Sequence, residues 1–318
     1  MIDNQWPSPY TNYKIYNYSL SESKNYDYFR EIETFFEDKF NCDAILTPSG
    51  RTAIAMVIRF KQINRSHSVY ITKWSSHCMF NTIGAFTNTT VDFVGTPDMI
   101  VINHKWGQPV LLKNEYRDSV LIEDSVDSIF LTPEALFPNN ADFEIISLPK
   151  IIGSYSGGII FSKDKNFTEY VRNLQKENLG LAKHQSRLKC IPPQDIKNFE
   201  TWLYHEAWNT SHDANSLTNI LNKLSFYEDN KRIITQRLEL LQDKLGLEFE
   251  IKDRIGPVYP LSLRKFKIVG NPNILLRNHS FSPYLEDNEY ESVHVLPLHF
   301  GISDKLFQRM LLSIKMKK

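Results

Sequence analysis

The sequence predicts an α/β fold, in which a mainly parallel β-sheet is flanked by helices and followed by a smaller C-terminal α+β domain. Short, apolar, β-branched runs alternate with helical segments up to about residue 163. This alternation is typical of a parallel sheet that is covered on both faces. Helical segments then dominate from about residue 165, and short strands and turns follow Gly246. We therefore expect a boundary near residues 225–245, which divides the chain into a large domain, residues 1–235, and a small domain, residues 236–318.

The individual elements follow from their apolar spacing. Residues 26–40 place apolar side chains at helical spacing, and residues 51–63 form a second amphipathic helix. A third helix is expected over residues 77–87. Strands are expected at residues 44–47, 68–74, 90–95, 99–107, 119–127, 142–150 and 157–163. Later helices are expected at residues 166–181, 195–209 and 216–245.

The composition is that of an ordinary soluble globular protein. Of the 318 residues, 42% are hydrophobic and 23% are charged, and the formal net charge is +0. No basic run stands out, so nucleic acid is not an expected partner. The N-terminus lacks the pattern of a signal peptide, and the apolar runs are too short to span a bilayer, so we expect no membrane insertion. The three cysteines lack metal-ligand spacing, which predicts no metal site and a cytoplasmic location.

Polar, aromatic and glycine residues follow the predicted strands at the points where ligands bind in parallel sheets. The groups lie at residues 49–51, 74–77, 104–107, 124–127 and 147–150. Because the carboxyl ends of parallel strands meet at one edge of a sheet, we expect the chemistry of the protein at this edge.

Two of these groups have a structural and a functional interpretation. Gly50 stands where a strand turns into a helix, and such a helix start can bind a phosphate. Taken alone, the stretch favours an ordinary strand-to-helix turn with Ser49 near the cap. Asp124 directly follows an apolar strand, so it is either an N-cap or a carboxylate aimed at a cationic ring nitrogen. Asp127 lies on the same face if a helix has begun.

The remaining groups are equally ambiguous when each is taken alone. Trp74 and His77 could stack on a flat ligand ring or serve as core and polar surface residues. His104 in the segment HKWG carries the same ambiguity. Ser147 and Lys150 supply a hydroxyl and an amine, and a lysine taken out of water can form a Schiff base, whereas a solvated one only ends a strand. Together, however, a phosphate site, an aspartate, an aromatic residue and a lysine are the parts of a pyridoxal-phosphate enzyme.

The chain resembles the DegT-type sugar aminotransferases, a family of fold-type I, pyridoxal-phosphate-dependent enzymes. The resemblance runs in order over most of the chain. It is carried by PSGRTAIAMVI, by VYITKWSSHCMFNTIGAFTNTTVDFV, by VINHKWGQPV, by LIEDSVDS, by SLPKIIGSYSGG and by VLPLHFGISDKLFQRML. Six short motifs in order are more specific than any one of them.

The resemblance implies a transamination that uses pyridoxal 5'-phosphate in a cytoplasmic homodimer. Lys150 would hold the cofactor and move the proton, and Asp124 would engage the pyridine nitrogen. The amino group would come from glutamate and go to a nucleotide-linked keto-sugar, for surface polysaccharide or secondary metabolite biosynthesis. The other cofactor-binding residues implied are Gly50, Arg51, Trp74, His77, Asp127 and Ser147, with His77 preferred to Trp74 as the stacking residue.

The sequence departs from the family pattern at several points. Asp127 stands where the family commonly has Gln or His, and Ser-Leu-Pro-Lys replaces a longer Ser-Phe-x-x-Thr-Lys form. The Gly-Tyr-Asn-x-Arg stretch that often reaches the partner subunit is missing, with SHDANSL in roughly that region. Two alternatives therefore stay open. One is a sugar dehydratase, although those relatives replace the lysine with histidine, and the other is a non-catalytic paralogue with a binding or regulatory role.

Overall fold

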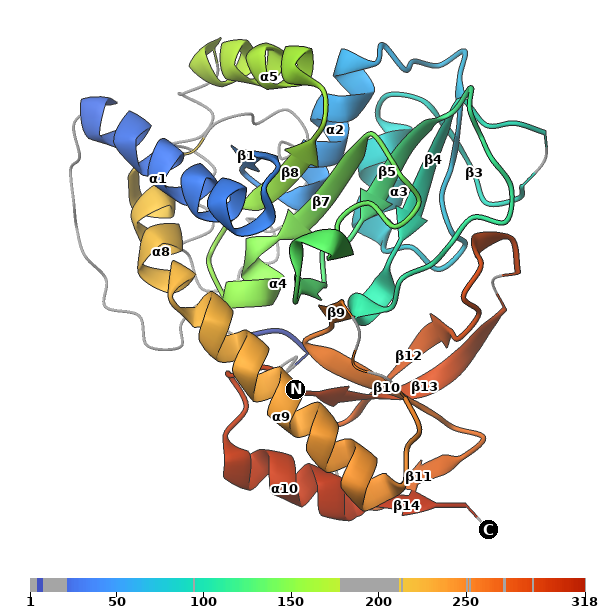
Figure 1. The fold of residues 1–318 in the computed structure, drawn as a ribbon. Coiled ribbons are helices and arrows are strands. Elements are labelled where there is room, and N and C mark those ends of the chain that lie inside the picture. The colour runs from blue at the N-terminus through green and yellow to red at the C-terminus, as the bar shows by residue number, and fades with distance from the viewer. Residues whose placement is uncertain are drawn as a thin grey trace, which may run out of the picture.

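A computed structural model describes residues 5–7, 22–93, 95–177, 212, 214–249, 251, 253–270, 273–287 and 289–317. Within this part of the chain, a seven-stranded sheet lies at the centre of the larger body, and a long helix runs from it to a second group of strands (Figure 1).

The central sheet has the strand order β1-β8-β7-β5-β4-β2-β3. Its strands are β1 (Asp43–Thr47), β8 (Gly158–Ser162), β7 (Phe143–Ser147), β5 (Val120–Asp124), β4 (Met99–Asn103), β2 (Ser68–Tyr70) and β3 (Asn88–Thr90). Strand β8 is antiparallel to both of its neighbours, and the other pairs are parallel. The six remaining strands therefore point the same way, and their carboxyl ends share one edge.

Helices cover both faces of this sheet because its strands are apolar on both sides. In β1, Ala44 and Leu46 join the core under α1 (Glu22–Phe40) and α8 (Ala214–Leu224). Ile45, between them, joins the opposite core under three helices. These are α2 (Gly50–Phe60), α3 (His77–Gly84) and α5 (Lys165–Glu177).

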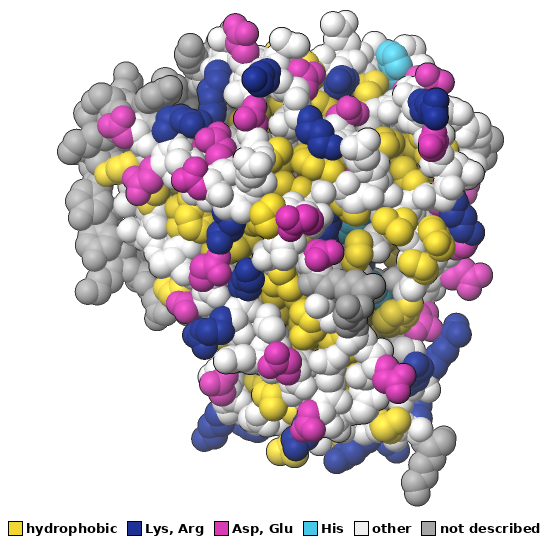
Figure 2. Space-filling view, viewed as in Figure 1, with side chains coloured by type: hydrophobic (Ala, Val, Ile, Leu, Met, Phe, Trp, Pro, Cys, Tyr) yellow, Lys and Arg dark blue, Asp and Glu magenta, His cyan; other side chains and the backbone are white. Residues whose placement is uncertain are grey.

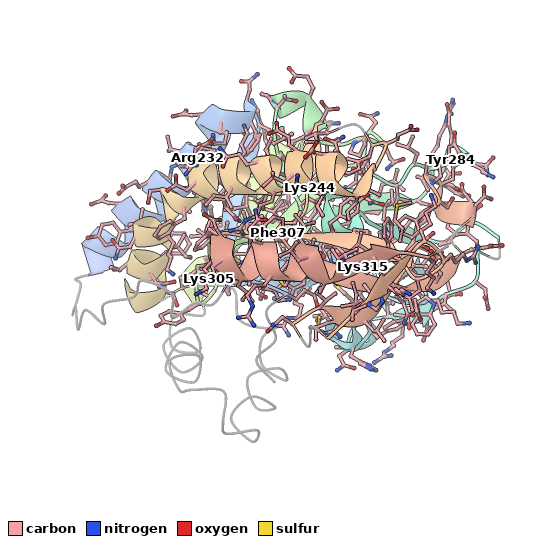
Figure 3. All side chains as sticks on the ribbon, turned by 90° about the horizontal axis from the view of Figure 1, so that it is seen from below. Arg232, Lys244, Tyr284, Lys305, Phe307 and Lys315 are labelled. Carbon is pink, nitrogen blue, oxygen red and sulfur yellow. The ribbon has the colours of Figure 1, made fainter. Side chains whose placement is uncertain are left out.

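The C-terminal part of the chain forms two small antiparallel sheets and one further helix. The larger sheet has the order β10 (Val258–Ser262), β13 (Tyr290–Pro297) and β12 (Leu275–Ser280). The smaller pairs β11 (Phe266–Ile268) with β14 (Ile314–Met316). Helix α10 (Asp304–Ser313) lies beside the long helix α9 (Phe226–Leu245) (Figure 3). Arg237 of α9 joins the two helices, since its guanidinium lies 5.0 Å from the ring centroid of Phe307 and pairs with Asp304 at 2.7 Å.

The C-terminal part contacts the region after β4 through backbone atoms that pack directly against one another. A Cβ atom on Gly107 would lie 2.2 Å from the Ile255 carbonyl carbon, and one on Gly256 would lie 2.1 Å from the Trp106 carbonyl oxygen. Both glycines are therefore required by close backbone approach. Beside them, β6 (Ile129–Phe130) pairs with β9 (Arg254–Ile255), which completes the connection.

The predicted fold class is confirmed, and a few elements differ from expectation. The strand predicted at residues 90–95 lies at Asn88–Thr90, because the chain turns away at Val91. The single helix predicted over residues 216–245 is divided between α8 and α9 at Ser225. The helix expected at residues 195–209 lies outside the described residues. Helix α9 crosses the boundary drawn at residues 235 and 236, and we retain that division as a proposal.

The distribution of surface charge and the apolar character of the helices bear on the expected partners. Lysine, arginine, aspartate and glutamate side chains are mixed over the face shown in Figure 2, without a large area of one sign. Among the described helices, none combines the length and the apolar character that crossing a membrane requires.

Candidate active site

The paired glycines bring two predicted groups together at the edge of the sheet. Gly157 has a φ of +112° and donates from its N–H to the Pro48 carbonyl at 2.7 Å. Gly158 is aligned with Thr47 on one side and with Ser147 on the other. A Cβ atom on Gly158 would lie 2.7 Å from the Gly50 nitrogen. The glycines thus allow the turn before α2 and the turn after β7 to pack backbone against backbone.

The turn at Gly50 is both a capped helix start and a neighbour of the aspartate segment. The Ser49 hydroxyl accepts from the Thr52 N–H at 3.2 Å, so the capping interpretation is correct for Ser49. A Cβ atom on Gly50 would lie 2.8 Å from a methyl carbon of Val126. The start of α2 therefore faces the segment that follows Asp124, and its first backbone N–H groups lie at the same sheet edge. Arg51 is the first residue after Gly50 in this helix.

Asp124 is a buried carboxylate at the end of β5. Its side chain accepts from the Asn103 amide at 2.9 Å and from the Val126 N–H at 3.3 Å. Burial raises the pKa of Asp124 to about 6, and the nearby Lys150 ammonium offsets part of that increase. No helix starts at Asp124, so it is not an N-cap. A buried carboxylate of this kind is stabilised by any cation that reaches it.

Lys150 is near enough to this carboxyl group for its charge to affect it, and it lies on a short helix, α4 (Leu148–Ile152), that follows β7 directly. Its amine Nζ is 4.0 Å from Oδ2 of Asp127 and 4.7 Å from the ring centroid of Trp6. The side chain is 30% exposed, which leaves one side accessible to a ligand. The amine is therefore enclosed on two sides and open on another.

The two carboxylate oxygens of Asp127 have different partners, the Trp106 backbone and the Lys150 amine. Oδ1 accepts from the Trp106 N–H at 2.8 Å, and Oδ2 faces Lys150. Trp106 has a φ of 59°, a left-handed conformation that costs energy in a residue with a side chain. The carboxylate of Asp127 satisfies the N–H of this strained turn. Asp127 thus points toward the lysine. No helix has begun at this position, so the condition for placing Asp127 on one helical face with Asp124 is not met.

His104 belongs to the core. It is fully buried, accepts from the Val110 N–H at 2.9 Å through Nδ1, and contacts Glu123 at 2.9 Å through Nε2. Burial lowers the pKa of His104 to about 3, so the ring is neutral and donates to the Glu123 carboxyl group. The structural interpretation of this histidine is therefore the correct one.

The two candidate stacking residues lie at the end of β2 and face solvent. Trp74 is 47% exposed, and its ring lies 6.4 Å from that of Tyr290. His77 is the first residue of α3 and is exposed. Ser147 ends β7 on the same sheet edge and is buried. The structure brings Gly50, Asp124, Asp127 and Lys150 together with Ser147, and places His77 and Trp74 farther along the edge.

Three residues of this site were not named as candidates from the sequence. Asn103 ends β4 and is aligned with Asp124, so comparison of the predicted strand ends could have found it. Trp106 belongs to the predicted strand-end group at residues 104–107 and contributes its backbone N–H, whereas Trp6 comes from a distant N-terminal segment. No local pattern in the sequence connects residue 6 with residue 150.

A pocket of about 640 Å³ opens beside the site, between residues 103–111 and the C-terminal sheet. Hydrogen-bonding side chains line much of it. They include Asn103, Lys105, Gln108, His279, Ser280, Ser282 and Tyr290. Asn103 lines the pocket and also donates to Asp124, so the pocket adjoins the region of that carboxylate.

The comparisons with known proteins agree with this geometry. The family model PLP_IMCC1989, described as "Putative PLP-dependent aminotransferase", matches residues 32–317. The chain therefore belongs to this family of PLP-dependent aminotransferases, and its cofactor is pyridoxal phosphate. None of the curated proteins searched matches the sequence.

Solved structures of sugar aminotransferases share the fold. The aminotransferase TlmJ from Streptoalloteichus hindustanus has a TM-score of 0.61 at 13% identity, over 90% of this chain and 89% of that chain. A DegT DnrJ EryC1 StrS aminotransferase from Brucella abortus has a TM-score of 0.58 at 12% identity, over 93% and 90%. A GDP-4-keto-6-deoxymannose-3-dehydratase, ColD, has a TM-score of 0.50 at 15% identity, over 70% of this chain and 66% of that chain. The predicted fold-type I resemblance is confirmed.

Pyridoxal phosphate fits the residues at this edge. The buried Asp124 carboxylate accepts only from neutral groups in its hydrogen bonds among the described residues, so a protonated ring nitrogen would supply a charged partner. The start of α2 directs backbone N–H groups to the same place for a phosphate. Lys150 lies close enough to Asp124 for its charge to affect that carboxyl group.

Proposed function

We propose that this enzyme transfers an amino group from glutamate to a nucleotide-linked keto-sugar, and that Lys150 and Asp124 are its catalytic residues. The observation that carries the proposal is the convergence of Lys150, Asp124 and the Gly50 turn at one sheet edge, although they lie on three separate segments. Membership of an aminotransferase family supports the reaction type.

Each residue has a defined task in this proposal. Lys150 would hold the cofactor through its amine Nζ and would carry a proton at that atom. Asp124 keeps the ring nitrogen protonated, because a proton there gives the buried carboxylate a charged partner. When bound, pyridoxal phosphate supplies a ring that accepts the electrons left behind when a proton leaves the amino donor.

The cofactor phosphate and ring are held by the surrounding residues. Gly50 and Arg51 contribute backbone at the helix start, and Ser147 contributes a hydroxyl group. His77 or Trp74, which follow β2, would stack on the ring. Asp127 lies beside the amine of Lys150. It takes the place of the Gln or His that relatives commonly have at this position.

The pocket beside the site supports a sugar acceptor. Its amide, imidazole and hydroxyl groups provide donors and acceptors for a ligand with many hydroxyl groups. Sugar aminotransferases are among the proteins with this fold. A cytoplasmic location, a homodimer and a role in polysaccharide or secondary metabolite biosynthesis are further parts of the proposal.

The first test is cofactor attachment. Purified protein given pyridoxal phosphate should turn yellow, and borohydride should fix the cofactor to one lysine, identified as Lys150 by peptide mass spectrometry. Lys150→Ala should lose this attachment, whereas Lys163→Ala, a change at a lysine on the far end of β8, should keep it. Protein that stays colourless with added cofactor would show a non-catalytic paralogue instead.

The second test is the half-reaction. Glutamate should bleach the yellow band, and the correct keto-sugar nucleotide should restore it. The structural neighbour that is a dehydratase offers the competing outcome. Loss of a hydroxyl group from the sugar without consumption of glutamate would replace transamination with dehydration.

A further inference from the structure

A short N-terminal segment, residues 5–7, covers one side of the Lys150 amine with Trp6. Its residues are anchored at both ends to the C-terminal part of the chain. Arg277 donates from Nε to the Gln5 side chain at 3.3 Å, and Pro7 lies against Gly301, where a Cβ atom would be 3.4 Å from the Pro7 Cα. Gln5 and Pro7 are buried. The residue between them, Trp6, is therefore held in a fixed place.

Trp6 presents its ring face to Lys150. The amine Nζ lies 4.7 Å from the ring centroid, within the range of a cation–π contact. Trp6 also packs against a small apolar cluster of Trp106, Val258, Val293 and Val295. The indole thus contacts both a cation and an apolar support.

Asp127 approaches the same amine with Oδ2 at 4.0 Å. Its other oxygen is bound to the Trp106 backbone, so the carboxylate cannot turn away without breaking that hydrogen bond. Trp106 is therefore common to both neighbours of the lysine. It supports the Trp6 ring with its side chain and fixes Asp127 with its N–H.

We propose that Trp6 is a positioning residue for the reacting lysine, and that its ring face and the Asp127 carboxylate form a two-sided seat for the Lys150 amine. The seat holds the amine when the lysine is not bound to the cofactor, so the free amine stays at the place where it must accept and return a proton. This proposal rests on the proposed role of Lys150, but the seat itself is testable without cofactor.

Chemical labelling of the cofactor-free, full-length protein tests the seat. Formaldehyde and cyanoborohydride methylate lysine amines, and peptide mass spectrometry gives the rate at each site. Lys163 is the internal reference, because its amine also lies over a ring, that of Phe137 at 4.4 Å. We expect Trp6→Leu to raise the ratio of the Lys150 rate to the Lys163 rate about threefold, since the amine loses its cation–π cover.

Two further variants separate the ring from the bulk of the side chain. Trp6→Phe keeps an aromatic face and should leave the ratio near the wild-type value. Asp127→Asn keeps the acceptor for Trp106 but removes the charge, and should raise the ratio as Trp6→Leu does. Equal ratios in Trp6→Phe and Trp6→Leu would overturn the proposal, even if both variants loosen the fold, because the reference lysine reports general loosening.

The half-reaction provides a second measurement. In Trp6→Leu, kcat for glutamate should fall about tenfold, with KM nearly unchanged, because a displaced amine affects proton transfer more than binding. A rise in KM alone would assign Trp6 to substrate binding and refute the seat. Failure of the wild type to bind pyridoxal phosphate would reject the proposed function and leave the labelling result to judge the seat separately.

Discussion

At the scale of single residues, burial decides which strand-end side chains are reactive. Asp124 and His104 both follow apolar strands, and both are buried. His104 is satisfied by Glu123 and a backbone N–H, so it is neutral and inert. Asp124 accepts from neutral donors and keeps a charge that burial disfavours. The aspartate therefore gains from a cationic ligand, whereas the histidine does not.

The raised pKa of Asp124 predicts a pH dependence. Because burial raises the pKa to about 6 in the folded protein, the folded state takes up a proton more readily than the unfolded state, where the pKa is near 3.8. The contribution of Asp124 to stability should therefore fall as pH rises from about 4 to 6 and stay constant above. We expect Asp124→Asn to stabilise the cofactor-free protein by about 3 kcal/mol at pH 7 and by little at pH 4.

Urea unfolding of the wild type and of the variant at both pH values measures this difference. The same variant should bind pyridoxal phosphate more weakly, because the ring nitrogen loses its charged partner. If the wild type and Asp124→Asn had equal free energies of unfolding at pH 7, ionisation of Asp124 would not destabilise the folded protein, which would contradict the prediction.

Single residues were predictable from the sequence where strand ends define them. Asp124, Gly50 and Lys150 each follow an apolar run, so the parallel-sheet rule was enough to place them at one edge. Trp6 was not predictable, because it lies on a segment far away in the chain, and Trp106 was predicted only as part of the strand-end group at residues 104–107. Their roles depend on tertiary contacts that no local spacing encodes.

At the scale of elements, β8 determines how closely the two main turns of the site approach. It is antiparallel to its neighbours and begins with Gly158, which packs closely against the backbone of Gly50. The sequence predicted an apolar run after the paired glycines, but its direction in the sheet could not be read from that run. Direction depends on the connection, and the short α4 turn with Gly157 allows β8 to return beside β7.

We predict that Gly158→Ala separates the turns. The added Cβ would meet backbone atoms 2.7 Å away, which cannot move as a side chain can, so the variant should lose about 2 kcal/mol of stability. Its affinity for pyridoxal phosphate should fall as well. Gly84→Ala is the matched control, because no atom lies within 4 Å of the added Cβ there. Denaturant unfolding and cofactor titration test both variants, and a Gly158→Ala protein as stable as Gly84→Ala would contradict the packing described.

At the scale of the whole molecule, a buried ionic group joins the central sheet to the C-terminal part. Arg254 of β9 pairs with Glu144 at 2.9 Å, lies 3.8 Å from Glu123, and donates to the Ser125 hydroxyl at 2.8 Å. Burial raises the pKa of Glu123 to about 7, and Arg254 offsets part of this increase. His104 completes the group with ligand atoms that could suit a metal, but the guanidinium already pairs with both carboxylates.

Removal of this arginine should weaken the attachment of the C-terminal part to the central sheet and lower the free energy of unfolding. Arg254→Met leaves two buried carboxylates without their cation, and we expect a loss of about 3 kcal/mol at pH 8. The loss should be smaller at pH 5, because the carboxyl groups then take up protons and no longer need a partner. Arg264→Met is the control, since Arg264 is exposed and its pair with Glu291 should contribute under about 1 kcal/mol. Thermal unfolding of the wild type, Arg254→Met and Arg264→Met at both pH values measures these losses. If Arg254→Met lost as much stability at pH 5 as at pH 8, unpaired carboxylate charge would not be the cause.

The backbone contact between Gly107 and Gly256 also has a consequence for synthesis. The ribosome makes Lys150, Asp124 and Asp127 long before it makes Gly256, yet the turn at Trp106 that holds Asp127 rests on that later glycine. Contacts between such distant segments form late in folding. A nascent chain that stops before residue 254 would therefore contain all the residues proposed to bind the cofactor and still lack the finished site. Cofactor binding can thus report that the last part of the chain has been made and has docked.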